Sequence, residues 1–224
     1  MIKNSELFFK VTQLRKAGAS YQEINKKFGV SKSTLSYWFH NKSWSENIRK
    51  DLQEQGRAKQ ALKIQYLNKL RYEYKLIRYE KYRNEARLEF HTLKNNKLFL
   101  IGISLYWGEG EKINKGRVSV INSDENMMRI VSLFYRNILR ISDNKLRAAL
   151  FLYEDMNENL LKQYWSKITH IPLHQFIKTQ FLHSRSTLTK RKVSHGMCTV
   201  YFSDTKTNIK IKEWIRLLSN DMRV

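Results

Sequence analysis

The chain of 224 residues contains very few residues that interrupt a helix: it has one proline, Pro172, and eight glycines. From Arg57 to Ile101 there is neither glycine nor proline, so no residue in that stretch opposes a continuous helix. The hydrophobic fraction is 42%, close to that of ordinary globular chains, which excludes wholesale disorder. The sequence therefore predicts long, uninterrupted elements and a sizeable core.

Charge is the second constraint. The chain has 42 Lys and Arg against 20 Asp and Glu, a net charge of +22. The excess is spread out, at +6 in residues 1–49, +7 in 50–97 and +9 in 98–224. A distributed excess favours a long surface that contacts phosphates, and double-stranded DNA is the expected partner. An anionic membrane is less favoured, because it usually requires a dense basic cluster beside an apolar anchor.

The single cysteine, Cys198, cannot form an internal disulfide or a multi-cysteine zinc site, and its position predicts a core residue. The first residues, MIKNSELFFKVTQLRKAG, lack the apolar region of a signal peptide. No stretch approaches the roughly 18 apolar residues that span a bilayer. We therefore expect a cytoplasmic, nucleoid-associated protein that does not contact a membrane.

Residues 1–42 predict three short helices, over 5–16, 21–28 and 32–39. Ser20 and Glu23 form a capping box, Gly29 makes the turn, and Ser31 caps the third helix. The apolar positions that would pack the second and third helices together are Ile24, Val30, Leu35 and Trp38. The string SYQEINKKFGVSKSTLSYWF resembles the helix-turn-helix of resolvase-type and related DNA-binding proteins.

This resemblance implies that the third helix enters the major groove of DNA. Its short hydroxyl side chains would reach base edges, and its lysine would lie beside phosphates. The side chains concerned are Lys32, Ser33, Thr34, Ser36 and Tyr37. The alternative is a small three-helix scaffold that contacts protein instead.

Residues 43–96 predict a basic helical connector, which Ser43 and Glu46 would begin with a capping box. Its apolar positions form a broken stripe, and its tyrosines alternate with Lys and Arg. Two roles are open: a DNA-tracking arm, or a spacer built as a helical hairpin or coiled coil whose tyrosines cover apolar stems. We favour the spacer.

Residues 97–110, KLFLIGISLYWGEG, predict an apolar helix that ends in a glycine-acid-glycine turn. Ser104 and Gly108 are four apart and lie on one face, where they would let another helix come close. Glu109 would lie at the C-terminal end of the helix, where the helix dipole disfavours a carboxylate. A divalent cation, which prefers oxygen ligands, would compensate for this charge.

The nonapeptide from Gly102 to Gly110 resembles the motif of the LAGLIDADG homing endonucleases. The resemblance places Ser104 at the small packing position, Glu109 at the metal-binding acid and Gly110 at the terminal glycine. It implies a homodimer that pairs through the Gly102–Gly110 helix and a shared Mg²⁺ site to which each copy contributes Glu109 and Gly110. Gly102 and Ile103 depart from the family's Leu-Ala, and Trp107 stands where an acid is common.

The rest of the chain supports an α+β domain over 97–224, with an apolar and a polar sheet face. Strands are expected at the start of RVSVINSDENMMRIVSLFYRNIL and over 145–153, 176–182 and 197–203, with Ser123 capping the helix after the first strand. Two further helices are expected over 157–168 and 205–218. In full, we expect an all-α helix-turn-helix, a long helical connector and a LAGLIDADG-like α/β saddle with a mixed or antiparallel sheet.

A twisted basic sheet of this kind can lie in the major groove. Its expected DNA-facing residues are Arg117, Ser119, Lys145, Arg147, Lys178, Gln180, Thr199 and Tyr201. Lys190 and Lys192, in the run TKRKVSHG, are candidates for the basic residue that the family places near the metal, or for contacts to phosphates. Glu154 and Asp155 are an alternative metal site.

Two functions follow from these patterns. The first is a homing-type endonuclease that makes metal-dependent phosphodiester cuts in double-stranded DNA. The second is a non-catalytic transcriptional regulator that combines the helix-turn-helix with a LAGLIDADG-like fold. Glu109 with its flanking glycines favours the nuclease, because a protein that only binds DNA has no physical need for that acid.

Overall fold

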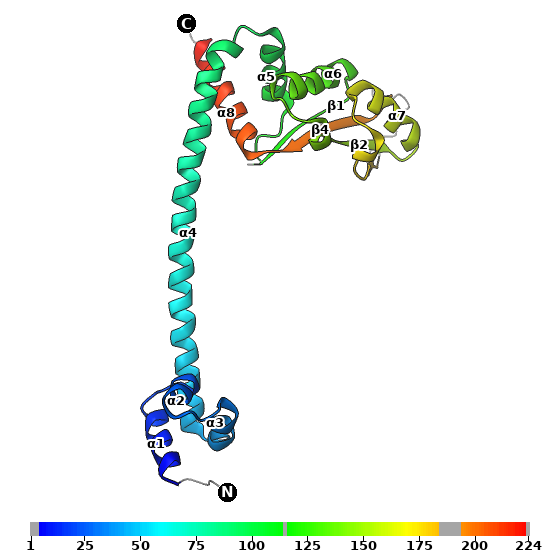
Figure 1. Cartoon of the computed structure of the whole chain (residues 1–224). Helices are drawn as coiled ribbons and strands as arrows, with labels where there is room; N and C mark the ends of the chain where they lie inside the picture. The colour runs from blue at the N-terminus through cyan, green and yellow to red at the C-terminus, as the bar shows by residue number, and fades with distance from the viewer. Residues whose placement is uncertain (1–4, 114–115, 184–193, 223–224) are drawn as a thin grey trace. The chain divides into compact units, whose positions relative to one another are not determined.

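The computed structural model describes residues 5–113, 116–183 and 194–222 (Figure 1). The chain divides into two compact units, residues 1–74 and 75–224. The first unit is helical and the second is an α+β unit with a four-stranded mixed sheet. The helix α4 contributes residues to both units.

In the first unit, α1 (Ser5–Lys16), α2 (Tyr21–Phe28) and α3 (Lys32–Phe39) confirm the three predicted helices. The capping box is also confirmed: the Ser20 side chain accepts from the Glu23 amide, and the Glu23 carboxylate accepts from the Ser20 amide. Gly29 has the left-handed conformation, with φ of 69°, that ends α2. The predicted packing positions lie in one cluster, with Ile24 and Leu35 fully buried and Val30 and Trp38 half-buried.

Arg15 is the unexpected member of this unit, because it is a cation that is 2% exposed. Its guanidinium donates to the backbone oxygens of Ala19 and Ser45 at 2.7 and 2.8 Å, and to the Ser45 hydroxyl at 3.1 Å. It also lies 4.7 Å from the centre of the Tyr21 ring. These contacts tie the end of α1 to the first turn of α4 and satisfy most of the donors that burial removes from water.

The helix α4 runs from Ser43 to Leu93 without interruption, so the expected connector is a single helix and not a hairpin. The predicted capping box at its start is wrong. Ser43 is already helical, the Glu46 amide donates to the Lys42 oxygen, and the Glu46 carboxylate binds Arg49. The Lys42 carbonyl accepts the first hydrogen bond of the helix, so the helix begins before Ser43 could cap it. The Glu46 side chain forms a surface ion pair with Arg49 instead.

The last turns of α4 are part of the core of the second unit. Ala86 and Phe90 are buried, and the Trp214 indole of α8 (Thr205–Asp221) donates to the Ala86 oxygen at 2.9 Å. Ion pairs flank this contact, from Arg87 to Glu213 at 2.8 Å and from Lys210 to residues of α4. This part of the expected connector therefore serves as a wall of the second unit.

The sheet has the strand order β1-β4-β2-β3. Its strands are β1 (Arg117–Asn122), β2 (Arg147–Tyr153), β3 (Gln180–Leu182) and β4 (Met197–Ser203). The strand β4 is antiparallel to both β1 and β2, and β3 is parallel to β2. The sheet is therefore mixed.

Three predicted boundaries are wrong. The strand predicted at 145 begins at Arg147, because a 3₁₀ turn (Asp143–Lys145) precedes it. The strand predicted over 176–182 is reduced to β3, with only an isolated bridge from Phe176 to Ala148 before it. The cap of α6 (Glu125–Leu133) is Asp124 and not Ser123, because the Asn122 side chain accepts from both amides that follow it and moves the helix start one residue on.

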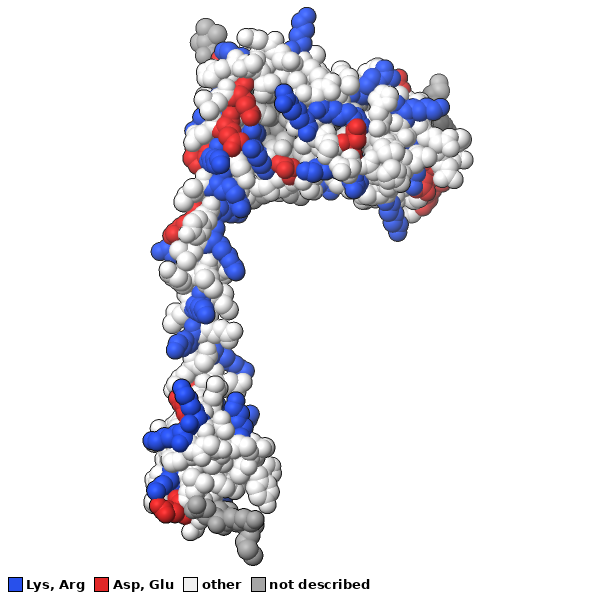
Figure 2. All heavy atoms as spheres, in the orientation of Figure 1, with Lys and Arg blue, Asp and Glu red and all other residues white. Residues whose placement is uncertain are grey.

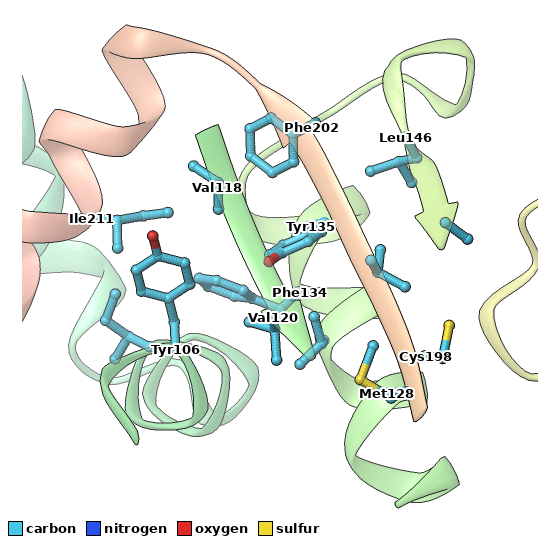
Figure 3. Packing of buried hydrophobic residues seen from close by; sticks show 14 of the residues in the cluster. Tyr106, Val118, Val120, Met128, Phe134, Tyr135, Leu146, Cys198, Phe202 and Ile211 are labelled. Carbon is cyan, nitrogen blue, oxygen red and sulfur yellow. The ribbon is translucent and has the colours of Figure 1, made fainter. Parts of the chain in front are cut away.

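One face of the sheet, here called the inner face, carries the core of the second unit (Figure 3). Its buried side chains are Val118, Val120, Ala148, Leu150, Leu152, Cys198, Val200 and Phe202. The helices α5 (Lys97–Glu109), α6 and α8 pack on this face (Figure 1). The prediction that Cys198 is a core residue is confirmed, and its burial raises the pKa of the thiol.

Candidate functional site

Glu109 is the last residue of α5, a helix that the Asn96 side chain caps at its other end. Its side chain is exposed, and within the described chain it makes no hydrogen bond or ion pair. The C-terminal end of a helix carries partial negative charge, so a carboxylate there is destabilised unless a cation approaches it. The structure therefore presents the Glu109 carboxylate at the protein surface with no ion-pair partner among the described residues.

The turn after Glu109 is held by backbone contacts. The Gly110 amide donates to the Tyr106 oxygen at 2.8 Å, and the Glu111 amide donates to the Ser119 oxygen of β1 at 2.9 Å. A Cβ at Gly110 would lie 2.4 Å from the Tyr106 oxygen, so only glycine fits. The Tyr106 hydroxyl donates to the Glu111 oxygen at 2.6 Å, and burial together with the nearby Glu111 charge raises the pKa of Tyr106 to about 12.

The outward face of α5 is apolar and small. Ile101 and Trp107 are 47% and 44% exposed, and Ser104 and Gly108 are exposed between them. A Cβ at Gly108 would meet no atom within 4 Å. On the other side of the helix, a Cβ at Gly102 would lie 2.2 Å from the Phe134 ring. Packing inside the chain therefore requires glycine at 102 but not at 108.

Sequence reasoning missed one residue near Glu109. The Lys112 ammonium donates to the Gly108 oxygen at 3.2 Å, which places a positive charge on a free carbonyl at the end of α5. A basic residue just after a helix end is a known C-terminal signal, so the position of Lys112 could have predicted this contact.

At the end of α5, Glu109 offers a metal ion one exposed carboxylate. Within the described residues, no three His, Cys, Asp or Glu side chains lie together as a metal site. Mg²⁺ is usually held by one or two carboxylates together with waters and substrate phosphates, so Glu109 fits such a site as one contributor. At the alternative site, Glu154 pairs instead with His183 at 2.9 Å.

The second sheet face, here called the outer face, holds six of the residues expected to contact DNA: Arg117, Ser119, Arg147, Gln180, Thr199 and Tyr201. Ser119, Tyr201 and Arg147 are direct partners across three strands. The Arg117 guanidinium lies 3.9 Å from the centre of the Tyr201 ring, and the Arg147 guanidinium bonds to the Asn144 and Leu146 oxygens. Arg117, Arg147, Gln180 and Tyr201 are partly or fully exposed on this face, whereas Ser119 and Thr199 are only 7% and 4% exposed. The structure therefore brings four of the six predicted residues to one surface and buries the other two.

The remaining predicted residues of the sheet lie apart from its strands. Lys145 is exposed in the 3₁₀ turn before β2, and Lys178 is exposed in the segment before β3. Lys190 and Lys192 lie outside the described residues.

In the first unit, α3 presents a polar surface. Lys32, Ser36 and Tyr37 are exposed, and Tyr37 is 81% exposed. The hydroxyls of Ser33 and Thr34 each lie 2.8 Å from the Ser31 hydroxyl at the cap, and Thr34 is half-buried. The side chains that are free to reach outward are thus those of Lys32, Ser36 and Tyr37.

In comparisons with known proteins, no family model, curated protein or solved structure matches the chain. In the described part of the chain, no helix combines the length and apolar composition that crossing a membrane requires. The candidate functional surfaces of the chain are therefore α3, the outer face and the end of α5.

Proposed function

We propose that this protein binds double-stranded DNA and cuts it as a divalent-metal-dependent endonuclease of the LAGLIDADG type, acting as a homodimer. The observation that carries the proposal is the exposed carboxylate of Glu109 at the end of α5, which forms no hydrogen bond or ion pair with the described residues. A folded monomer gains nothing from a carboxylate placed against the negative end of a helix. A cation shared with a substrate phosphate gives that carboxylate a role.

The outward face of α5 supports the homodimer. Ser104 and Gly108 are small, exposed and one turn apart, and Gly108 is not required by contacts inside the chain. Pairing of this face with α5 of a second copy would bring the two helix backbones close. Each copy would then place Glu109 and the Gly110 turn beside the same point, and the two sheets would form one LAGLIDADG-like saddle.

The residues of this chain would divide the chemical work between them. Glu109 would hold a divalent cation, preferably Mg²⁺, and the tight turn at Gly110 would fix its direction. When bound, such a cation supplies the activation of water and the stabilisation of the leaving oxygen that phosphodiester hydrolysis needs. Lys112, at the end of α5, is placed to meet a phosphate oxygen.

DNA binding would use two surfaces. The outer face of the sheet would lie in the major groove, with Arg117, Arg147 and Tyr201 toward the duplex. The α3 helix would read a separate short sequence through Lys32, Ser36 and Tyr37. Lys145, Lys178, Lys190 and Lys192 would add contacts to phosphates.

The test compares the wild type with Glu109→Gln on a plasmid that carries the protein's own genomic flanks. Cutting is followed in Mg²⁺, and binding without cutting is measured in Ca²⁺. We expect the wild type to cut, and the variant to bind equally while losing at least about 100-fold in rate, because the cation loses its charged ligand. Glu154→Gln is the matched control, since it neutralises the alternative carboxylate, and should cut as the wild type does.

Two results would overturn the nuclease proposal. If the wild type binds tightly but does not cut in Mg²⁺ or Mn²⁺, the protein is a non-catalytic regulator that reads DNA through α3 and the outer face. If Glu154→Gln loses cutting and Glu109→Gln retains it, the metal site has been placed at the wrong carboxylate.

A further inference from the structure

The middle of α4 contains an uninterrupted basic segment, defined here as Arg57–Tyr72. It has five cations and no Asp or Glu. The cations are Arg57, Lys59, Lys63, Lys69 and Arg71. A run of 16 residues with this composition is unlike the rest of α4, where acidic side chains recur and form ion pairs with their neighbours.

The cations of the basic segment are available for contact. All five are exposed, and none of them forms an ion pair within the described chain. Within the described chain, their one hydrogen bond runs from the Arg71 guanidinium to the Asn68 side-chain oxygen at 3.4 Å. In Figure 2, Lys and Arg side chains project from the middle of α4 with few acidic side chains beside them.

The cations point to more than one side of the helix. Lys59 and Lys63 are four residues apart and share one side, whereas Arg57 and Arg71 are about four full turns apart and share another. Exposed apolar and aromatic residues are interspersed with these cations, among them Tyr66, which is 62% exposed and follows Lys63 by three residues on the same side of the helix. The basic segment is helical, and no described element of the chain covers it.

Two other partners fit this pattern poorly. A helix that lies on a membrane segregates its cations on one face and its apolar residues on the other, and the basic segment does not. A coiled coil with a second copy would bring five cations of each chain together, with no carboxylate in either segment to balance them. A polyanion with charges on several sides of the helix matches the charge and its distribution.

We infer that the basic segment of α4 is a further contact surface for the phosphate backbone of double-stranded DNA. The inference rests on the proposed function, because the partner is the duplex that α3 and the outer face bind. The segment is about 24 Å long at 1.5 Å per residue. A duplex presents one phosphate charge per about 1.7 Å of its axis, so a phosphate is available for every cation of the segment.

The salt dependence of binding gives the expected effect. Each phosphate contact contributes about −0.9 to the slope of log affinity against log salt concentration. The triple variant Lys59→Gln, Lys63→Gln and Arg71→Gln keeps good helix formers and removes three cations. We expect its slope to be shallower by about 2.7, so that raising salt from 50 to 200 mM weakens wild-type binding about 40-fold more than it weakens binding of the variant.

The experiment measures duplex binding by fluorescence anisotropy in Ca²⁺ at several salt concentrations, with the full chain and one fixed DNA. Circular dichroism confirms that the variant keeps its helix content. The matched control is Lys97→Gln, Arg129→Gln and Lys167→Gln, which removes three exposed cations from the helices of the second unit. This control should keep the wild-type slope.

The outcomes separate this inference from the proposed function. If the wild type binds duplex and the triple variant has the same slope, the basic segment does not contact DNA, and the proposed function stands. If the wild type does not bind duplex at all, both are overturned. A slope difference seen with duplex RNA, or a loss of binding to phosphatidylserine vesicles, in place of the effect on DNA would assign the segment to that partner and refute the inference.

Discussion

Replacement of Gly108 by alanine should stabilise the folded monomer and weaken the proposed dimer. Gly108 lies within α5, and a Cβ there would meet no atom within 4 Å. Alanine is favoured over glycine inside a helix by about 0.5–1 kcal/mol. Because Gly108 is one residue from the end of α5, we expect a gain of about 0.5 kcal/mol in the free energy of unfolding.

The same substitution six residues earlier, at Gly102, should instead destabilise the folded chain. A Cβ at Gly102 would lie 2.2 Å from the Phe134 Cγ atom and 2.7 Å from its Cβ atom. Overpacking a core usually costs about 1–3 kcal/mol, and an overlap with a fully buried ring belongs at the upper end. After the gain in helix propensity, Gly102→Ala should lower the free energy of unfolding by about 2 kcal/mol.

Urea unfolding at one low protein concentration measures both stabilities, and sedimentation over a range of concentrations measures association. Gly108→Ala should raise the dimer dissociation constant at least about tenfold, because two added methyl groups would meet where the helices approach. Ser104→Ala, which stays small, is the control and should associate as the wild type does. If Gly108→Ala associates and cuts DNA as well as the wild type, close approach at Gly108 is not needed and the reasoning fails.

Two further predictions concern buried charges. Arg15→Met should raise the rate of amide hydrogen exchange in α1–α3, because loss of the hydrogen bonds to Ser45 removes about 3 kcal/mol from the stability of the first unit. Hydrogen bonds from Arg216 and then Arg87 lower the pKa of Glu213 from its ordinary value of 4.5, in spite of its burial. The folded state therefore favours the Glu213 carboxylate, and the stability that it contributes is present above pH 4.5 and lost as the pH falls through its lower folded-state pKa. Acid unfolding curves should show the wild type losing its advantage over Glu213→Gln below that pH, and an advantage that grows with acid would refute the assignment.

The first unit could be predicted closely because its determinants are local. Ser20 and Glu23 form the capping box within four residues of each other, and Gly29 ends α2 through its own conformation. Neither contact depends on a distant segment. Arg15 was not found, because its partner Ser45 follows three intervening turns and no local pattern marks a buried arginine.

The bounds of a strand were predicted best where the strand has a neighbouring strand on both sides. The strand β4 lies between β1 and β2, and its predicted bounds and buried face are confirmed. The edge strand β3 has one partner and ends after three residues, although alternation in the sequence predicted seven. Alternation of apolar and polar residues shows which residues can form a strand. The length of β3 depends, in addition, on how far β2 runs beside it.

At the candidate site, the sequence predicted where Glu109 lies but could not separate the roles of the two glycines in α5. Gly102 and Gly108 occur in the same helix and have the same intrinsic helix propensity. The Phe134 ring, from a segment that follows α6, makes glycine necessary at 102, and no described atom does so at 108. A glycine near the end of a helix lowers its stability unless another group occupies the space that the missing side chain leaves. If α5 of a second copy occupies that space, the same contact that explains Gly108 also brings a second Glu109 to the cation.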